Sequence, residues 1–194
     1  MSMSAPKPGR KYTYGDYLKW PGEERWEIID GVPYMMSPAP SSEHQRILLE
    51  IASQLHLYLR GKSCMVFPAP FDVRLPRGDE KDEDIQTVVQ PDIVVICDNS
   101  KLDRRGYRGA PAMVVEILSP QTTKKDLREK YDLYERSGIK EYWVVFPLDQ
   151  VLDVYLLDEE GKYQKNRTYE KDARVKPSIF EDLEIDLGLV FRDN

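Results

Sequence analysis

The sequence has few of the residues on which redox and zinc chemistry depend. It contains two cysteines, Cys64 and Cys97, and two histidines, His44 and His56. Both cysteines lie in or beside apolar, strand-like segments. We therefore expect buried thiols that act as small hydrophobic side chains, rather than a disulfide or a zinc site. The two histidines lie too far apart along one helical segment to pair, which argues against a histidine-rich metal site.

Sequence motifs of nucleotide-dependent and serine-dependent enzymes are also missing. There is no G-x-G-x-x-G or Walker A pattern, which argues against a glycine-rich phosphate loop. Ser119 precedes a proline rather than a helix-opening glycine, so there is no G-x-S-x-G nucleophile turn. No apolar run is long enough to span a bilayer, and the N-terminus lacks a signal-peptide core, so we expect a cytoplasmic protein.

The composition is that of an ordinary globular domain. Of the 194 residues, 41% are hydrophobic and 32% are charged, which suits one domain with one sizeable core. We expect residues 1–11 to form a flexible tail and residues 12–194 to form a single domain. The formal net charge of −6 argues against broad, nonspecific nucleic-acid binding, although active-site carboxylates contribute negative charge that a metal ion offsets.

Hydrophobic periodicity predicts a mixture of strands and helices. Asp30-Gly31 between two short apolar runs indicates a β-hairpin. Ser42-Glu43-His44-Gln45 matches a capping box, and the apolar spacing after it predicts a helix to about residue 60. A second helix is expected over 123–137, and further strands over 64–67, 71–75, 91–97, 112–118, 140–146, 151–157 and 162–169. This order indicates an α/β domain with one central mixed sheet flanked by helices.

Two carboxylates in consecutive apolar strands are the most informative feature of the chain. Asp92 follows a proline at the start of one predicted strand, and Glu116 lies inside the next. Such continuous Val/Ile/Leu runs are typical of strands buried on both faces, where a carboxylate is costly unless its charge is compensated. On adjacent strands, the two carboxylates can share one divalent cation with oxygen ligands. The pair therefore indicates metal-assisted hydrolysis, with nucleic acid as the first substrate to test.

Each of these residues also has an ordinary structural explanation. Asp92 fits a solvent-exposed strand end, and Glu116 fits a buried ion pair with an arginine or lysine. Lys130 shares the inward face of the second helix with Tyr131 and Tyr134, so it can reach over the end of the sheet. There it can orient a water molecule or stabilise a phosphorane charge, or its stem can simply cross the surface of the core.

Four further residues are candidate accessories to this site. Lys124 lies one turn before Lys130 on the same helix face and is its alternative. Glu27 in the first strand, and Glu43 and His44 in the first turn of the first long helix, can each supply or orient a ligand. Ordinary roles fit them better, since a glutamate suits a helix N-terminus electrostatically and His44 fits a surface position.

Taken together, these segments resemble the Uma-two family of restriction endonucleases, a branch of the PD-(D/E)XK nuclease superfamily. The resemblance extends over nearly the whole chain and rests on collinear stretches at 26–31, 42–45, 91–95, 114–120, 130–134 and 138–143. It implies a restriction-endonuclease-like fold with a central mixed sheet and flanking helices. It also implies that Mg²⁺, or Mn²⁺ in its place, is bound by Asp92, Glu116 and the backbone carbonyl of Ile117.

The reaction that the resemblance implies is in-line attack of water on a DNA phosphodiester, which leaves a 5′-phosphate and a 3′-hydroxyl. One position departs from the superfamily pattern, because Leu118 stands where a lysine is usual. The resemblance implies Lys130 as its substitute. Since symmetric cleavage of duplex DNA favours two copies, we expect a homodimer. The alternative hypothesis, motivated by Leu118 and the negative charge, is a catalytically inactive nuclease-fold protein that binds DNA or a protein partner.

Overall fold

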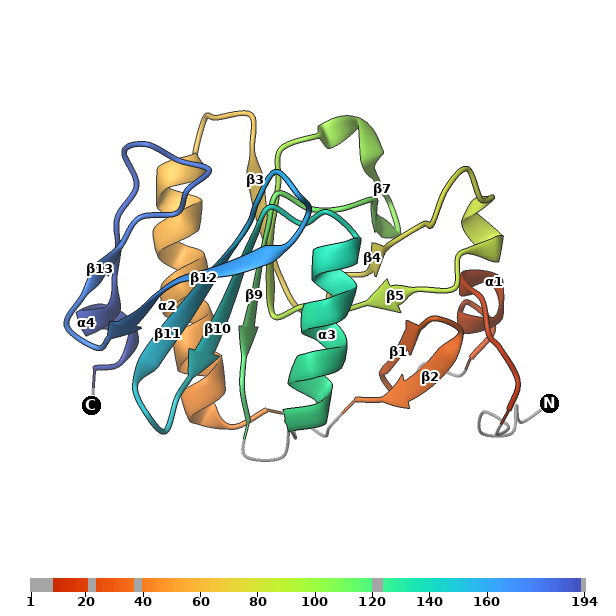
Figure 1. Ribbon diagram of the computed structural model, residues 1–194, viewed down its shortest axis with the longest axis horizontal. Coiled ribbons are helices and arrows are strands. Elements are labelled where there is room, and N and C mark those ends of the chain that lie inside the picture. Colours follow the sequence, from red (N-terminus) through yellow and green to blue (C-terminus); the bar gives the residue numbers. More distant parts are fainter. Residues whose placement is uncertain (1–8, 21–23, 37–39, 120–123, 193–194) are drawn as a thin grey trace.

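The structure, a computed structural model, describes residues 9–20, 24–36, 40–119 and 124–192, with the side chains of 124–127 left out. Within these residues, two six-stranded sheets and a two-stranded ribbon carry the β structure (Figure 1). Helices α2 (Ser42–Leu59) and α3 (Lys124–Arg136) pack on opposite faces of one of them, the central sheet. The predicted α/β class with a central mixed sheet flanked by helices is confirmed.

The central sheet has the strand order β12-β11-β10-β9-β6-β3, and within it β9 and β10 are the parallel pair. A parallel pair needs a crossover connection, and here the chain leaves β9, passes through α3 and returns as β10. The strands are β3 (Met65–Pro68), β6 (Ile93–Ile96), β9 (Met113–Ile117), β10 (Glu141–Phe146), β11 (Val151–Leu157) and β12 (Tyr163–Glu170).

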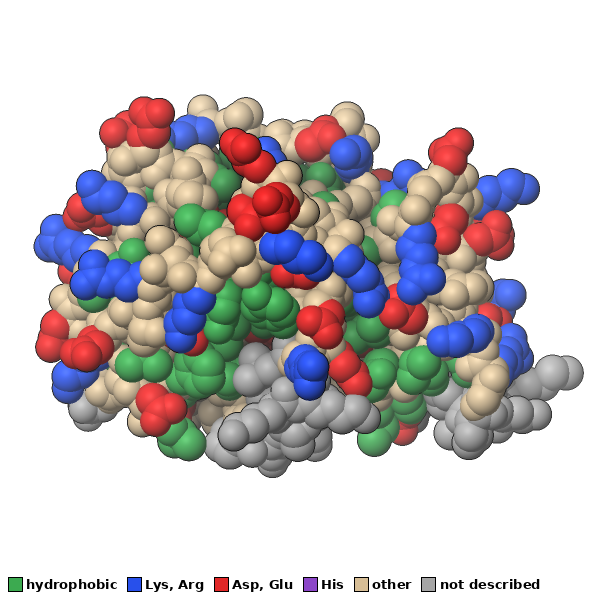
Figure 2. Space-filling model, in the orientation of Figure 1, with side chains coloured by type: hydrophobic (Ala, Val, Ile, Leu, Met, Phe, Trp, Pro, Cys, Tyr) green, Lys and Arg blue, Asp and Glu red, His purple; other side chains and the backbone are tan. Residues whose placement is uncertain are grey.

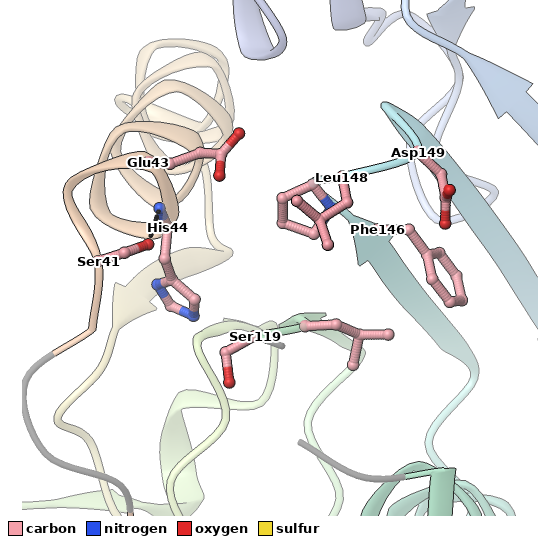
Figure 3. Close-up of a pocket in the computed structure, with 9 residues that line it drawn as sticks. Ser41, Glu43, His44, Ser119, Phe146, Leu148 and Asp149 are labelled. Atoms are coloured by element: carbon pink, nitrogen blue, oxygen red, sulfur yellow. Dashed lines mark hydrogen bonds between the residues drawn. The ribbon is translucent and has the colours of Figure 1, made fainter. Parts of the chain in front are cut away.

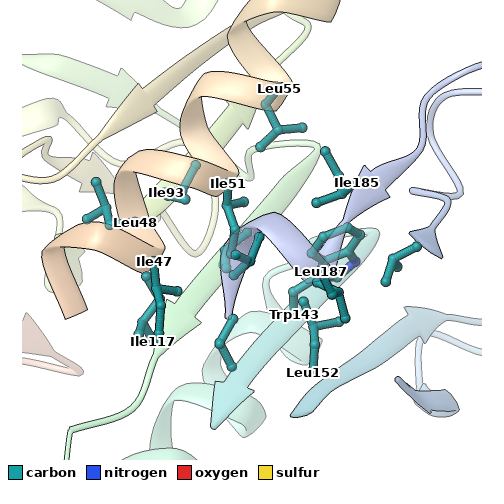
Figure 4. Packing of buried hydrophobic residues seen from close by; sticks show 14 of the residues in the cluster. Ile47, Leu48, Ile51, Leu55, Ile93, Ile117, Trp143, Leu152, Ile185 and Leu187 are labelled. Carbon is teal, nitrogen blue, oxygen red and sulfur yellow. The ribbon is translucent and has the colours of Figure 1, made fainter. Parts of the chain in front are cut away.

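Side chains of the central strands alternate between two hydrophobic cores. In β6, Ile93 and Val95 pack with α2, whereas Val94 and Ile96 pack in the core that contains residues of α3. Figure 4 shows the first of these cores, which also holds Trp143 of β10. The continuous Val/Ile runs of the sequence therefore fill both faces of the sheet, as expected for doubly buried strands.

The second sheet lies beside the central sheet and was not predicted as a separate unit (Figure 1). Its hairpin turns at Asp30 and Gly31, with φ of 52° and 78°, so the predicted β-hairpin is confirmed. Several of its strands have only two residues, too few for a period of two to be visible in the sequence. In sheet order they are β2 (Val32–Met35), β1 (Trp26–Ile29), β5 (Val88–Val89), β4 (Val73–Arg74), β8 (Gly106–Arg108) and β7 (Leu102–Asp103).

The prediction of two buried cysteine thiols is wrong. Cys64 and Cys97 form a disulfide across the ends of β3 and β6, and Cys97 is exposed. Because Met65 pairs with Ile96 in these antiparallel strands, the next residues outward face each other, with their Cα atoms 4.1 Å apart. Strand pairing, which the sequence alone did not reveal, therefore brings the two sulfur atoms together.

The C-terminal segment packs against α2 and the central sheet. It contains β13 (Arg174–Val175), β14 (Ile185–Asp186) and the short helix α4 (Leu187–Val190). Glu141, fully buried at the start of β10, anchors the loop between the two strands. Its Oε2 accepts hydrogen bonds from the N–H and the hydroxyl of Ser178, each at 2.7 Å, and its Oε1 accepts one from the indole of Trp143 at 2.7 Å.

The N-terminal part of the chain is described from Gly9 onward, so most of the predicted tail, residues 1–11, lies outside the described residues. The described N-terminal residues include α1 (Tyr14–Tyr17), and two short 3₁₀ turns, Asp82–Asp84 and Asn99–Lys101, lie further along the described chain. The single domain over 12–194 stays a prediction. Within the described part of the chain, every helix is too short or too polar to cross a bilayer.

Candidate active site

Strand register brings Asp92 and Glu116 to adjacent positions. In the antiparallel pair β6 and β9, Ile93 lies opposite Val115. Asp92, one residue before Ile93, therefore lies beside Glu116, one residue after Val115. The backbone N–H of Ile117 donates to Asp92 Oδ2 at 2.7 Å, which fixes this carboxylate against the end of β9. The two carboxylates that the sequence singled out therefore lie together at the same end of two neighbouring interior strands of the central sheet.

Glu116 is a buried carboxylate with two donors from α3. It is 7% exposed, although four of the five residues of its strand are apolar. Lys130 Nζ and the hydroxyl of Tyr134 both donate to Glu116 Oε1, at 2.9 and 2.6 Å. Lys130 and Tyr134 are four residues apart, one helical turn, so one face of α3 carries both.

Lys130 also contacts a second buried carboxylate. Its Nζ lies 3.1 Å from Oε1 of Glu27, which is 6% exposed in β1 of the second sheet. The same Glu27 oxygen accepts the backbone N–H of Gln90 at 2.8 Å, two residues before Asp92. One ammonium group therefore joins carboxylates from the two sheets. The sequence offered Glu27 as a candidate accessory residue, but it did not predict the contact with Lys130.

Burial and charge set the protonation of these groups. Burial raises the pKa of Glu116 to about 7, although the positive charge of Lys130 opposes this shift. Burial alone would lower the pKa of Lys130, but the charges of Glu116 and Glu27 raise it above its ordinary value. Burial also raises the pKa of Tyr134 well above 10.0. At neutral pH, Lys130 is therefore a fixed cation and Tyr134 a hydrogen-bond donor.

The first turn of α2 places His44 against the other carboxylate. The N-cap of this helix is Ser41, one residue before the predicted cap, and its Oγ accepts the N–H of His44 at 3.2 Å. The His44 side chain is buried, with Nε2 at 3.3 Å from Asp92 Oδ2 and a hydrogen bond to the backbone of Ile117. Its Nδ1 is buried without a hydrogen-bond partner in the described structure. The expectation of a surface histidine is wrong, because His44 lies three and four residues before Ile47 and Leu48 and therefore shares their buried face of α2.

The ionisation of His44 follows from the same contacts. Burial lowers the pKa of His44, but the hydrogen bond to Asp92 and the charge of that carboxylate outweigh it, so the pKa is raised. The two remaining candidates are Glu43 and Lys124. Glu43 is exposed in the first turn of α2, and the side chain of Lys124 lies outside the described residues.

A pocket opens beside this cluster, and its walls come from three elements (Figure 3). The first turn of α2, the end of β9 and the turn between β10 and β11 surround a volume of about 170 Å³. His44 lines this pocket as well as contacting Asp92, so the pocket lies next to the two carboxylates. The lining residues are Ser41, Glu43, His44, Leu118, Ser119, Phe146, Pro147, Leu148 and Asp149.

The donor set suits a hard divalent cation. Asp92, Glu116 and the carbonyl of Ile117 offer only oxygen atoms, and Mg²⁺ commonly binds to one or two carboxylates while keeping several waters. Within the described residues, no three His, Cys, Asp or Glu side chains form a ready-made metal cluster. A cation here would therefore rely on carbonyl, water and substrate oxygens in addition to the two carboxylates.

Comparison with a solved structure shows the fold class of this protein. A solved structure from Anabaena variabilis, described as a "putative nuclease belonging to DUF820", matches with a TM-score of 0.72 at 23% identity. The match covers 92% of this chain and 97% of that one. The fold is therefore that of the restriction-endonuclease-like α/β proteins.

The family follows from a match to the sequence. The model of the Uma2 family, described as "Putative restriction endonuclease", matches residues 14–188, so the chain belongs to this family and the resemblance is confirmed. The chain is also 27% identical over 165 residues to "Uncharacterized protein slr1290" of Synechocystis sp., covering 84% of this chain and 82% of that protein.

Two residues of the cluster were missed by sequence reasoning. Tyr134 was interpreted as part of the core face of α3, although its position four residues after Lys130 already places it on the same face. Gln90 lies just before the Pro91-Asp92 pair, and no sequence pattern pointed to it. Its side chain accepts from Arg25 and donates to Asp72, which links Glu27 and Asp92 to a wider polar network.

The raised pKa of Glu116 predicts a pH dependence of stability in the absence of metal. Its folded-state pKa of about 7 exceeds the ordinary 4.5, so between these values the folded protein binds more protons than the unfolded chain. The free energy of unfolding should therefore fall as the pH rises through this window. We expect urea unfolding in EDTA, at pH 5 and pH 7.5, to show a smaller decrease for Glu116→Gln than for wild type. Equal decreases would contradict the assignment of this proton to Glu116.

Proposed function

We propose that this protein is a metal-dependent endonuclease that hydrolyses DNA phosphodiester bonds. One observation carries the proposal: Asp92 and Glu116 lie side by side at the same end of the neighbouring strands β6 and β9, and the ammonium of Lys130 contacts Glu116 at 2.9 Å. Membership of a family described as restriction endonucleases supports DNA as the substrate. Two copies would suit cleavage of both strands of a duplex, so we also propose a homodimer.

Asp92, Glu116 and the carbonyl of Ile117 would hold the divalent cation, Mg²⁺ or Mn²⁺. Such a cation polarises the phosphodiester and lowers the pKa of water, which supplies a nucleophile at neutral pH. The carboxylates of the chain fix the position of this centre, because the Ile117 N–H and His44 both hold Asp92 Oδ2. Glu116 would bind in its ionised form, releasing the proton that burial otherwise retains.

Lys130 would supply a fixed positive charge to the reaction. Its raised pKa keeps it protonated at neutral pH, so it is suited to orient water or stabilise the charge on the phosphorane rather than to accept a proton. Glu27 would act as a positioning residue, because its Oε1 also contacts the ammonium, at 3.1 Å. The lysine absent at Leu118 is thus supplied from α3.

The surface fits binding at a defined site rather than broad adhesion to nucleic acid. On the face shown in Figure 2, acidic and basic side chains are interspersed, and the formal net charge of the chain is −6. A protein of this charge gains little from nonspecific neutralisation of phosphates. We therefore propose that affinity depends on the metal centre and on contacts close to it.

Metal binding tests the proposal. We expect calorimetry with Mn²⁺ to detect binding to wild type and no binding to Glu116→Gln, because the amide removes a charged ligand. Glu170→Gln, which changes an exposed carboxylate at the end of β12, is the matched control and should bind as wild type does. Circular dichroism should show that all three proteins are folded. Absence of binding to folded wild type, with or without DNA, would overturn the proposal.

The same samples separate the alternative function. A nuclease-fold protein that only binds DNA would retain its DNA affinity in Glu116→Gln and would cleave plasmid DNA in neither form. A purely structural Glu116–Lys130 ion pair predicts no metal binding at all, together with loss of stability when either partner is removed.

A further inference from the structure

The pocket beside the carboxylates has apolar walls and an acidic rim. Leu118, Phe146, Pro147 and Leu148 supply the apolar walls, Glu43 and Asp149 carry its negative charges, and His44 in the lining is paired with Asp92. In Figure 3, Leu148 extends from the β10–β11 turn into the space between the first turn of α2 and Phe146. The side chain is 76% exposed, so the pocket wall is apolar surface left in contact with water.

The charge of the rim decides which part of a nucleic acid this pocket can accept. Two carboxylates repel phosphate, so the backbone of a DNA strand is excluded from it. Carboxylates instead accept hydrogen bonds from exocyclic amino groups of bases. Apolar and aromatic side chains stack on the faces of unpaired bases. The cavity volume of about 170 Å³ leaves room for a single nucleobase.

The position of the pocket relative to the carboxylates fits the same occupant. Leu118 and Ser119 directly follow Ile117, and the pocket residue His44 contacts Asp92. A base held here would therefore lie next to a phosphodiester placed at Asp92 and Glu116. In the closed duplex this base is stacked, so occupancy requires an unpaired or extruded nucleotide.

We infer that this pocket binds one unpaired nucleobase that carries an exocyclic amino group, next to the phosphodiester to be cleaved. The inference rests on the proposed nuclease function for its biological meaning. Leu148 is its specificity-determining wall, and Glu43 and Asp149 select adenine or cytosine over bases that present a carbonyl oxygen at the same position.

Free nucleosides test the pocket without metal, phosphate or cleavage. In EDTA, adenosine should shift the ¹³C-methyl resonances of Leu118 and Leu148 and should bind about fivefold or more tightly than inosine, whose carbonyl replaces the amino group. The sugar phosphate 2-deoxyribose 5-phosphate, which lacks a base, should leave these resonances unchanged.

A pair of exposed leucines provides matched variants. Leu148→Asp should weaken adenosine binding about tenfold, because it removes an apolar wall and adds a third carboxylate. Leu57→Asp changes a leucine that is 64% exposed on the same helix as Glu43, about 20 Å further along its axis, and should have no effect. Both sites are exposed, so both variants should fold.

The outcomes separate this inference from the proposed nuclease function. Absence of adenosine shifts, binding insensitive to Leu148→Asp, or equal shifts with the sugar phosphate would each overturn the nucleobase pocket, whatever the metal titration shows. Adenosine binding in a protein that fails the Mn²⁺ titration would retain the pocket and overturn the nuclease.

Discussion

Replacing Lys130 by methionine should lower the rate of Mn²⁺-dependent plasmid cleavage by about 10²–10³-fold, the usual effect of removing one preorganised group that stabilises transition-state charge. Methionine keeps an unbranched side chain of similar reach but has no charge to offer the phosphorane. The side chain is 17% exposed and touches both Glu116 and Glu27, so little water is available to replace the ammonium. The readout is the first-order rate of supercoiled DNA loss at saturating Mn²⁺.

Metal affinity distinguishes a catalytic role of Lys130 from a merely structural one. Removing a cation beside Glu116 should leave Mn²⁺ binding intact or make it tighter, since two like charges no longer compete for the same carboxylate. Glu116→Gln, by contrast, should lose both metal binding and cleavage. Unchanged cleavage in Lys130→Met would contradict the assigned role.

A loss of stability in Lys130→Met must be separated from a loss of catalysis. Lys130→Met leaves two buried carboxylates without their cation, which commonly costs about 3–5 kcal/mol. Lys162→Met removes an exposed lysine that pairs with Glu135 at 2.9 Å and should cost less than about 1 kcal/mol. Rates should therefore be measured at a temperature at which circular dichroism shows Lys130→Met to be folded.

Replacing Glu141 by alanine should lower the free energy of unfolding by about 3 kcal/mol, because several buried donors lose their acceptor at once. The carboxylate accepts from Trp143 and from both donor groups of Ser178, and it is fully buried. Burial raises the pKa of Glu141, which reflects the cost of keeping its charge away from water. Part of the loss is therefore offset when that charge is removed.

The measurement is urea unfolding combined with amide hydrogen exchange. Exchange should increase most in the C-terminal segment that Glu141 anchors, which begins at Ser178 and includes β14. Glu184→Ala is the matched control, since this exposed glutamate pairs only with surface cations within the described residues and should cost less than about 1 kcal/mol. Uniform exchange along the chain would show that Glu141 does not anchor that segment.

The central strands and the two carboxylates could be predicted because their signals in the sequence are local, whereas the adjacency of the carboxylates follows from the register of β6 and β9. Continuous apolar runs mark doubly buried strands, and a carboxylate within such a run needs a partner, which led to Glu116. The 3.6-residue helical period placed Lys130 on the inward face of α3, and it contacts Glu116 there.

The remaining features depend on contacts between distant segments. The second sheet is built from very short strands, so its pairing leaves no periodic pattern in the sequence. Glu27 reaches Lys130 only because that sheet lies beside the central one. The disulfide follows from the register of β3 and β6, and the burial of His44 follows from the packing of the inward face of α2 on the central sheet.

Asp92 occupies the joint between the two sheets. The chain passes from β5 in one sheet to β6 in the other through Gln90, Pro91 and Asp92 alone, a link that reaches about 10 Å when extended. A link of three residues allows the two sheets little movement relative to each other at this point. A ligand or partner that separated the two sheets at a remote point would therefore change the spacing between Glu27 in one sheet and the Lys130–Glu116 pair at the other without touching any of these residues.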